Sequence, residues 1–218
     1  MNLILKLFRF LFPEKKAEFP PLVLTPLPTL PTLAEVYKDY QQSENVGYGD
    51  KGSGHSYIPI YDKLLSPYRH NSNVLEIGFA TGNSLCMWRD YFIEGNIYGI
   101  DKDRKRKLDE RVKDKAVNIF YGDATDELCL RSFENIKFDV IIDDASHTLT
   151  DQVRSYNLFK NKLNSGGIYI IEDIRNIDRS KETFLKLDKE KSVEIIDLRN
   201  EKGRSDDVLV ALKDLTKE

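Results

Sequence analysis

The chain has 218 residues, of which 40% are hydrophobic and 32% charged, and its formal net charge at pH 7 is −3. This length allows one domain with an appendage and a sizeable core. The mixed charge gives no support for a nucleic-acid partner, which usually needs a basic patch. No segment reaches the roughly 20 apolar residues of a membrane span. The two cysteines have no metal or redox spacing. We therefore expect free thiols and a cytoplasmic location.

Residues 1–12 are apolar apart from Asn2, Lys6 and Arg9, which fall near one face of a helix. We expect this helix to pack on the domain or on a second copy of the chain, which would make a homo-oligomer. A peripheral membrane contact is the alternative. Residues 13–31 hold six of the eight prolines, which predicts an extended linker. The boundaries that we expect are an appendage at 1–32 and a folded domain at 33–218.

A helix is predicted at 33–42, followed by a glycine-rich loop at 47–57 and a helix at 58–68. The loop carries Lys51, His55 and Tyr57 directly before the first strand of the core. A plain connection is one interpretation of this segment, and a lid over a ligand is the one that we favour.

Strands and helices alternate along the rest of the chain. Strands are expected at 74–77, 97–101, 116–121, 138–143 and 167–172, with helices between them at 85–91, 104–112, 126–132 and 150–163. A helix at 181–188 and strands at 193–198 and 208–212 follow. The pattern predicts an α/β, Rossmann-like fold: a seven-stranded, mostly parallel sheet with helices on both faces and an antiparallel final strand.

A glycine turn follows the first core strand. Gly78 and Gly82 allow positive φ and a close approach of the backbone to a ligand, and Asn83 and Ser84 begin the next helix. The spacing is neither that of a dinucleotide-binding loop nor that of a P-loop. Glu76 at the strand end would repel a pyrophosphate, whereas its carboxylate suits a ligand with an ammonium group.

Two more acids end successive strands. Asp101 closes the second strand, where it can accept hydrogen bonds from both hydroxyls of a ribose. Asp123 and Ala124 follow the third strand, where they can lie near an adenine amino group. A single acid in such a place is often only a helix cap. Acids at the ends of three successive strands are much harder to attribute to chance.

A denser group of polar residues follows the apolar strand at 138–143. Asp143 and Asp144 are followed closely by His147, and the strand at 167–172 ends in Glu172 and Asp173. Unpaired charge is costly inside a sheet, so these side chains should lie beyond the carboxyl ends of the strands, where open α/β sheets bind ligands. Adjacent strand residues point to opposite faces, so only one of Asp143 and Asp144 can easily be a metal ligand. We interpret this convergence as the reaction centre.

The glycine loop and the acid series resemble those of class I S-adenosylmethionine-dependent methyltransferases over about residues 47–213. A narrower resemblance is to the metal-dependent sugar O-methyltransferases of the macrocin and mycinamicin type, often grouped as cephalosporin-hydroxylase-like. It rests on four segments: Asp50-Lys51-Gly52 with His55 and Tyr57, the helix from Met87 to Phe92, Asp143-Asp144-Ala145-Ser146-His147, and Ile171-Glu172-Asp173.

The resemblance implies specific roles at the reaction centre. Asp144, Glu172 and Asp173 would bind Mg²⁺ (or Mn²⁺), and His147 would be the general base. Asp143 would face the methionine part of the cofactor or orient His147. The same resemblance places S-adenosylmethionine on the residues of the glycine loop, the acid series and the lid: Glu76, Gly78, Gly82, Asn83, Ser84, Asp101, Asp123, Ala124, Asp143, Lys51 and Tyr57.

These expectations predict methylation of a sugar hydroxyl of a glycan or glycosylated metabolite. A histidine with a pKa of about 6.5 can accept the hydroxyl proton near neutral pH. A hard divalent ion held by oxygen ligands stabilises the developing alkoxide. Two alternatives stay open: a catechol or phenol acceptor, and a non-catalytic, cofactor-binding partner subunit attached through the N-terminal segment.

Overall fold

The computed structural model describes residues 30–41 and 49–214. The chain divides into two units, Met1–Leu30 and Pro31–Glu218, and every helix and strand described belongs to the second. The expectations for the apolar helix at 1–12 and for most of the proline-rich linker lie outside the described residues.

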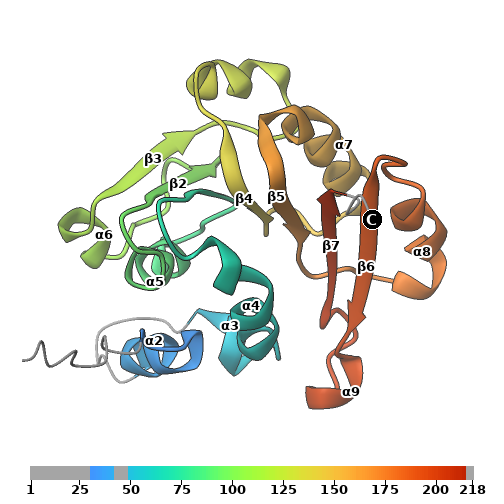
Figure 1. Ribbon diagram of the computed structural model, residues 1–218, viewed down its shortest axis with the longest axis horizontal. Helices are drawn as coiled ribbons and strands as arrows, with labels where there is room; N and C mark the ends of the chain where they lie inside the picture. Colours follow the sequence, from blue (N-terminus) through green and yellow to red (C-terminus); the bar gives the residue numbers. More distant parts are fainter. Residues whose placement is uncertain (1–29, 42–48, 215–218) are drawn as a thin grey trace, which may run out of the picture. The chain divides into compact units, whose positions relative to one another are not determined.

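The described residues form one seven-stranded sheet with the order β3-β2-β1-β4-β5-β7-β6 (Figure 1). Strands β1 to β5 pair in parallel, and β7 runs antiparallel to both β5 and β6. The predicted fold class is therefore confirmed, including its antiparallel end. The strands are β1 (Asn73–Ile77), β2 (Asn96–Asp101), β3 (Val117–Tyr121), β4 (Phe138–Asp143), β5 (Leu163–Ile171), β6 (Lys191–Asp197) and β7 (Val208–Asp214).

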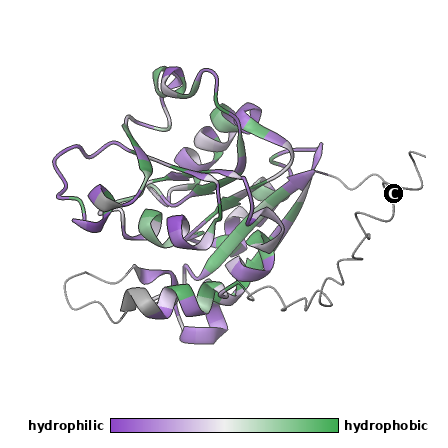
Figure 2. Cartoon of the chain, turned by 60° about the vertical axis from the view of Figure 1, so that its left-hand side comes forward, coloured by the Kyte–Doolittle hydropathy of each residue, from purple (hydrophilic) through white to green (hydrophobic). Residues whose placement is uncertain are grey.

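Helices cover both faces of the sheet because successive strand residues point to opposite sides. Val140 and Ile142 join one apolar cluster with residues of α2 (Leu33–Gln41), α4 (Ile58–Leu65) and α5 (Asn83–Tyr91). Ile141 joins a second cluster with residues of η2 (Glu127–Phe133), α7 (Leu149–Phe159) and α8 (Ile177–Leu185). The strands are accordingly hydrophobic along much of their length (Figure 2). The remaining short helices are α3 (Asp50–Ser53), η1 (Ser66–Tyr68), α6 (Arg111–Asp114), η3 (Lys160–Lys162) and α9 (Arg199–Lys202).

Two predicted helices differ from the structure. The helix expected at 104–112 is reduced to the four residues of α6. The preceding run is exposed and rich in lysine and arginine, so it has little apolar surface to bury and its like charges repel on a helix. The helix expected at 126–132 is instead the 3₁₀ segment η2, whose cap Asp126 accepts the backbone N–H of Leu128.

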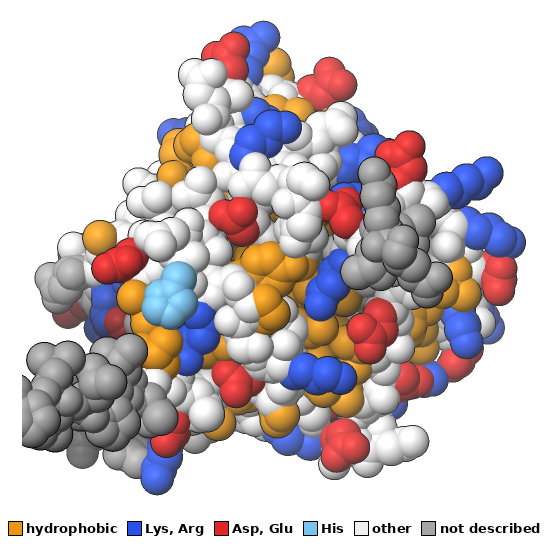
Figure 3. Space-filling model, in the orientation of Figure 1, with side chains coloured by type: hydrophobic (Ala, Val, Ile, Leu, Met, Phe, Trp, Pro, Cys, Tyr) orange, Lys and Arg blue, Asp and Glu red, His pale blue; other side chains and the backbone are white. Residues whose placement is uncertain are grey.

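Acidic, basic and hydrophobic side chains are interspersed over the face shown in Figure 3. Among the described helices, none has the length and hydropathy needed to cross a bilayer.

Strand register brings the polar strand ends together. Asp143 pairs with Ile77 of β1 and with Ile171 of β5. The ladder continues one step further, because Asp144 N donates to Ile77 O (2.8 Å) and Glu172 N donates to Asp143 O (2.9 Å). The strand order reverses between β1 and β4, which is where open α/β sheets form their ligand crevice. The acids that follow β4 and β5 therefore meet beside the glycine turn that follows β1.

We predict that Phe133→Ala lowers the free energy of unfolding by about 3–5 kcal/mol, because it removes a fully buried ring from the core. That ring lies 4.8 Å, 5.5 Å and 6.0 Å, between centroids, from Phe120, Phe138 and Phe159. Urea denaturation followed by circular dichroism measures the change. Leu128→Ala on the same segment is the control: Leu128 is 59% exposed, so its change should stay within about 0.5 kcal/mol. Equal losses in the two variants would contradict the packing.

Candidate active site

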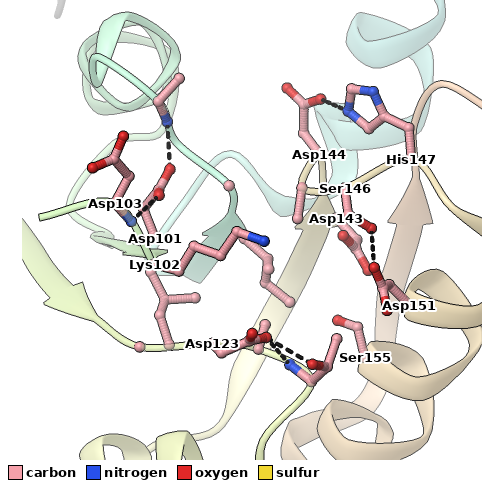
Figure 4. A pocket seen from close by; sticks show the side chains of 18 of the residues that line it. Asp101, Lys102, Asp103, Asp123, Asp143, Asp144, Ser146, His147, Asp151 and Ser155 are labelled. Carbon is pink, nitrogen blue, oxygen red and sulfur yellow. Dashed lines mark hydrogen bonds and ion pairs between the residues drawn. The ribbon is translucent and has the colours of Figure 1, made fainter. Parts of the chain in front are cut away.

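A cavity of about 750 Å³ opens beyond the carboxyl ends of β1 to β4. This volume lies within the range of about 300–1,000 Å³ that is usual for small-molecule sites. Figure 4 shows Asp101 and Asp103 on one side, Asp144, Ser146 and His147 of the β4–α7 connection on the other, and Asp123 between them near Ser155. The labelled lining residues are Asp101, Lys102, Asp103, Asp123, Asp143, Asp144, Ser146, His147, Asp151 and Ser155.

The glycine turn after β1 lies directly against the connection after β4. Gly78 and Gly82 have φ of 87° and 86°, so the positive φ expected at both is found. A Cβ at Gly78 would lie 2.4 Å from the carbonyl oxygen of Asp144 and 2.6 Å from Cα of Ala145. Only glycine fits here without displacing backbone. The two loops that line the cavity are thus in backbone contact.

Asp101 and Asp123 are held in fixed orientations by backbone groups. Asp101 Oδ2 accepts Ala80 N (2.9 Å) and its Oδ1 accepts Asp103 N (2.8 Å). Asp123 Oδ1 accepts the amide and hydroxyl of Thr125 (2.9 and 2.7 Å). The Thr125 amide and hydroxyl hold the pKa of Asp123 below its usual range. Both acids line the cavity as charged acceptors in defined positions.

Lys51 of α3 is buried among carboxylates from three strand ends. Its side chain is 3% exposed, and its Nζ lies 2.5 Å from Glu172 Oε1, 2.8 Å from Asp144 Oδ2 and 3.3 Å from Glu76 Oε1. Glu76 also accepts Ser84 Oγ (2.5 Å). The sequence suggested that Glu76 suits a ligand with an ammonium group, and the ammonium that it faces in the structure belongs to Lys51.

The pKa shifts in this cluster follow from burial and mutual attraction. Burial alone would lower the pKa of Lys51, but the combined charges of Asp144, Glu172 and Glu76 outweigh it and raise that pKa well above its usual value. Burial likewise opposes ionisation of Asp144, yet Lys51 and His147 hold its pKa below the usual value. Burial and the charge of Asp144 raise the pKa of Glu172. Lys51 and Asp144 are thus a charged pair at neutral pH.

His147 lies between two acids at the cavity wall. Its Nε2 is 3.0 Å from Asp144 Oδ1 and its Nδ1 is 3.5 Å from Asp173 Oδ2. The hydrogen bond to Asp144 raises the pKa of the imidazole. His147 and Asp173 both adopt left-handed backbone conformations (φ 57° and 54°), and strain of this kind concentrates at functional sites.

The oxygen of Asp173 that does not face His147 contacts two residues of the predicted lid. Asp173 Oδ1 accepts the hydroxyl of Tyr57 (2.8 Å) and lies 3.4 Å from Nε2 of the buried His55. His55 Nδ1 in turn lies 3.3 Å from Asp207. Tyr61, one helical turn after Tyr57, donates to Glu172 Oε1 (2.6 Å). Our sequence reasoning missed Tyr61, although its i+4 spacing from Tyr57 on a predicted helix could have revealed it.

Three groups of described residues bring possible metal-ligating atoms within 4.8 Å of one another: Asp50, His55 and Asp173; Asp144, His147 and Asp173; and Glu76, Asp144 and Glu172. The predicted set of Asp144, Glu172 and Asp173 is therefore distributed over two groups that share Asp144. All three side chains gather at one edge of the sheet, as the strand ends predicted. The three acids do not form a single group within that distance.

The remaining predicted site residues divide between the cavity and its surroundings. Asp143 lines the cavity beside Ser155 and accepts Tyr169 Oη (3.3 Å), and burial raises the pKa of Asp143 to about 7. The predicted cofactor residues that line the cavity are Gly78, Asp101, Asp123, Ala124 and Asp143. Six others do not line it and lie behind or beside its walls: Glu76, Gly82, Asn83, Ser84, Lys51 and Tyr57.

Comparison with known proteins places this fold and its motifs in a family context. The family described as "Methyltransferase domain" matches residues 75–174. The chain is 33% identical over 137 residues to an 8-demethyl-8-alpha-L-rhamnosyl tetracenomycin-C 2'-O-methyltransferase from Streptomyces olivaceus, with 58% of this chain and 35% of that protein covered. It is 35% identical over 134 residues to a demethylmacrocin O-methyltransferase from Streptomyces fradiae, with 56% and 33% covered. The chain thus spans about a third of the length of these curated relatives.

Solved structures with the same fold include the MycE methyltransferase of the mycinamycin biosynthetic pathway in complex with Mg, SAH and mycinamycin VI. That structure aligns with a TM-score of 0.63 at 23% identity and covers 84% of this chain and 54% of its own. A fibrillarin/Nop5p complex aligns with a TM-score of 0.55 at 18% identity, covering 66% of this chain and 73% of its own. The resemblance to methyltransferases read from the motifs is confirmed.

We predict that Gly78→Ala abolishes ligand binding in the cavity and lowers the free energy of unfolding by several kcal/mol, since the new Cβ would overlap the backbone after β4. Gly166→Ala is the matched control, because Gly166 also has a positive φ (78°) but a Cβ added there would meet no atom within 4 Å. That variant should lose only the left-handed strain of about 1–2 kcal/mol. Thermal and urea unfolding measure the stability of both variants. Equal losses of unfolding free energy in Gly78→Ala and Gly166→Ala would argue against the close contact between the two loops.

Proposed function

We propose that this chain, whose residues 75–174 match the family described as "Methyltransferase domain", is an S-adenosylmethionine-dependent O-methyltransferase. Its acceptor would be a sugar hydroxyl of a glycan or glycosylated metabolite, its metal a divalent ion, and its general base His147. The observation that carries the proposal is the placement of His147, flanked by Asp144 and Asp173, at the wall of a cavity whose opposite wall presents Asp101 and Asp123. The named sugar O-methyltransferases among the relatives support the acceptor class.

The cavity residues suit the parts of the cofactor. Asp101 keeps a defined orientation through Ala80 N and Asp103 N, and its oxygens have lone pairs left for two ribose hydroxyls. Asp123 presents a second acceptor in the same cavity, and we assign it to the adenine amino group. Gly78 allows the turn after β1 to lie against the β4 connection, and both segments line the cavity where the methionine part would bind. Lys51 and Tyr57, in contrast, contact the acids and are withdrawn from our cofactor assignment.

The donor set suits a hard divalent ion. Asp144, Glu172 and Asp173 offer carboxylate oxygens only, which Mg²⁺ and Mn²⁺ accept more readily than zinc does. One oxygen of each acid is bonded to Lys51, Tyr57 or Tyr61. The second oxygens of Asp144 and Asp173 face His147, and Glu172 Oε2 contacts no described donor. When bound, the ion would lower the pKa of the acceptor hydroxyl and orient the sugar.

The protein's own residues supply the proton transfer and the geometry. His147 accepts the proton of the sugar hydroxyl as the oxygen forms its bond to the methyl carbon, and the carbon–sulfur electron pair leaves with the sulfur. Asp144 fixes the imidazole through Nε2 (3.0 Å), and the proton would go to Nδ1, which makes no hydrogen bond with a described residue and lies 3.5 Å from Asp173 Oδ2. Holding both reactants in line supplies much of the rate acceleration.

We predict that Asp101→Ala weakens binding of S-adenosylhomocysteine at least tenfold, because hydrogen bonds to a charged acceptor contribute about 1.5–3 kcal/mol each. Isothermal titration calorimetry measures the dissociation constant. Asp103→Ala is the control, since Asp103 is exposed on the same wall and contacts Asp101 only through its backbone N–H. Its affinity should stay within twofold of wild type. No detectable binding by the wild-type protein would remove the proposed function.

Replacing His147 with alanine should reduce methyl transfer to a sugar acceptor by at least about 100-fold, the usual contribution of a general base. Affinity for S-adenosylhomocysteine should stay within twofold, since the imidazole lies at the acceptor side. Transfer of radiolabelled methyl to a panel of rhamnosides and other glycosides measures the rate. An unchanged rate would exclude His147 as the base.

The same panel separates the alternatives. Methylation of catechols but not of glycosides would favour the phenolic acceptor. Binding of S-adenosylhomocysteine without turnover on any acceptor would favour a cofactor-binding partner subunit.

A further inference from the structure

We infer that Lys51 is a positioning residue for the divalent-ion site, acting through the outer oxygens of Asp144 and Glu172. This inference rests on the proposed function. The inference adds to the proposed function a role for Lys51, a side chain that does not line the cavity and does not contact the reacting groups.

The ammonium of Lys51 joins two acids from different strand ends. Lys51 Nζ donates to Asp144 Oδ2 (2.8 Å) and to Glu172 Oε1 (2.5 Å), across sequence separations of 93 and 121 residues. The side chain is 3% exposed. An ammonium that is buried this completely, with carboxylates on several sides, is a fixed part of the structure, unlike a mobile surface charge.

The oxygens of the three acids differ in what holds them. Asp144 Oδ2 is held by Lys51, Glu172 Oε1 by Lys51 and Tyr61, and Asp173 Oδ1 by Tyr57. Asp144 Oδ1 lies 3.0 Å from His147 Nε2, Asp173 Oδ2 lies 3.5 Å from His147 Nδ1, and Glu172 Oε2 makes no hydrogen bond or ion pair with any described residue. One oxygen of each acid is therefore fixed by Lys51, Tyr61 or Tyr57, and Glu172 keeps its second oxygen for a ligand.

Partners of this kind orient metal ligands and commonly change metal affinity by about 10–100-fold when removed. Lys51 of α3, Tyr61 of α4 and Tyr57, which directly precedes α4, do not line the cavity. They would hold the carboxylates at the angles that an ion needs.

A competing role for Lys51 predicts the opposite change in divalent-ion affinity when Lys51 is replaced. If the ammonium only occupied the place of the ion, its removal would free two carboxylates and eliminate a positive charge, and a divalent ion would bind more tightly. If Lys51 positions the ligands, its removal leaves Asp144 and Glu172 free to turn apart, and the ion binds more weakly. The direction of the change distinguishes the two roles.

The experiment measures Mn²⁺ binding to the full-length protein by electron paramagnetic resonance of free Mn²⁺. Lys51→Met keeps a long side chain without the charge, and we expect its Mn²⁺ dissociation constant to rise at least tenfold. The Mn²⁺ concentration for half-maximal activity should rise in parallel, while the KM for S-adenosylmethionine stays within twofold. A dissociation constant equal to or below that of wild type would overturn the inference.

Lys202→Met is the matched control for the placement of α3. Lys202 Nζ donates to the carbonyl oxygens of Gly52 and His55 (the latter 2.6 Å) and so holds the same segment without touching the three acids. Its Mn²⁺ affinity should stay within twofold of wild type. If Lys202→Met also loses Mn²⁺ affinity tenfold, the effect of Lys51→Met comes from displacement of α3, and the inference is overturned.

Tyr61→Phe tests the same oxygen of Glu172 without a change in charge. We expect its Mn²⁺ dissociation constant to rise at least threefold. If circular dichroism shows that Lys51→Met is unfolded, this variant decides alone, and wild-type affinity in it would overturn the inference. Wild-type protein that binds S-adenosylhomocysteine but no Mn²⁺ would exclude the ion and the role of Lys51, while the cofactor part of the proposed function would stand.

Discussion

The structure depends on one ammonium group that is buried among three acids. Glu76, Asp144 and Glu172 come from the ends of β1, β4 and β5. Burial raises the pKa of Glu76 and of Glu172, whereas Lys51 and His147 hold the pKa of Asp144 below its usual value. Burying the charge of Asp144 without a counter-charge would cost several kcal/mol. Lys51 lies within 3.3 Å of all three. The same ion pairs hold the short helix α3 at the edge of the sheet, because Lys51 belongs to that helix. The segment before the first strand is thereby part of the site.

Strand register and loop contact then determine where the chemistry can occur. Because Asp143 is level with Ile77 and Ile171, the residues that follow these strands leave the sheet at the same height. The β4 connection carries His147 to the cavity wall, and α7 begins two residues later. The other wall belongs to β2 and β3, with Asp101 and Asp123. A cavity with a basic imidazole on one side and fixed acceptors on the other follows from the order of the strands alone.

Much of this arrangement was predictable from residues at strand ends. Asp101, Asp123, Asp144 and His147 each follow an apolar run, and parallel strands bring their carboxyl ends to one edge, so their convergence needs only the fold. The role of Lys51 was not predictable in this way. It lies in a glycine-rich segment, and local pattern carries no information on a partner 93 or 121 residues away. The glycine-rich segment was expected to cover a ligand, whereas its lysine is buried among acids. The helix expected at 104–112 was wrong for a different reason. The run before α6 has many like charges and little apolar surface to bury, so a helix there gains little stability.

The contact at Gly78 has a consequence for how the two ligands affect each other. A Cβ at that position would lie 2.4 Å from the carbonyl oxygen of Asp144, so the segment that we propose to hold the nucleoside and the segment that we propose to carry a cation ligand are in close contact. Restricting either segment restricts the other. If binding of the cofactor orders this contact, the cation then binds to a segment that is already ordered, and its affinity rises. By thermodynamic reciprocity, the cation raises the affinity for the cofactor by the same factor.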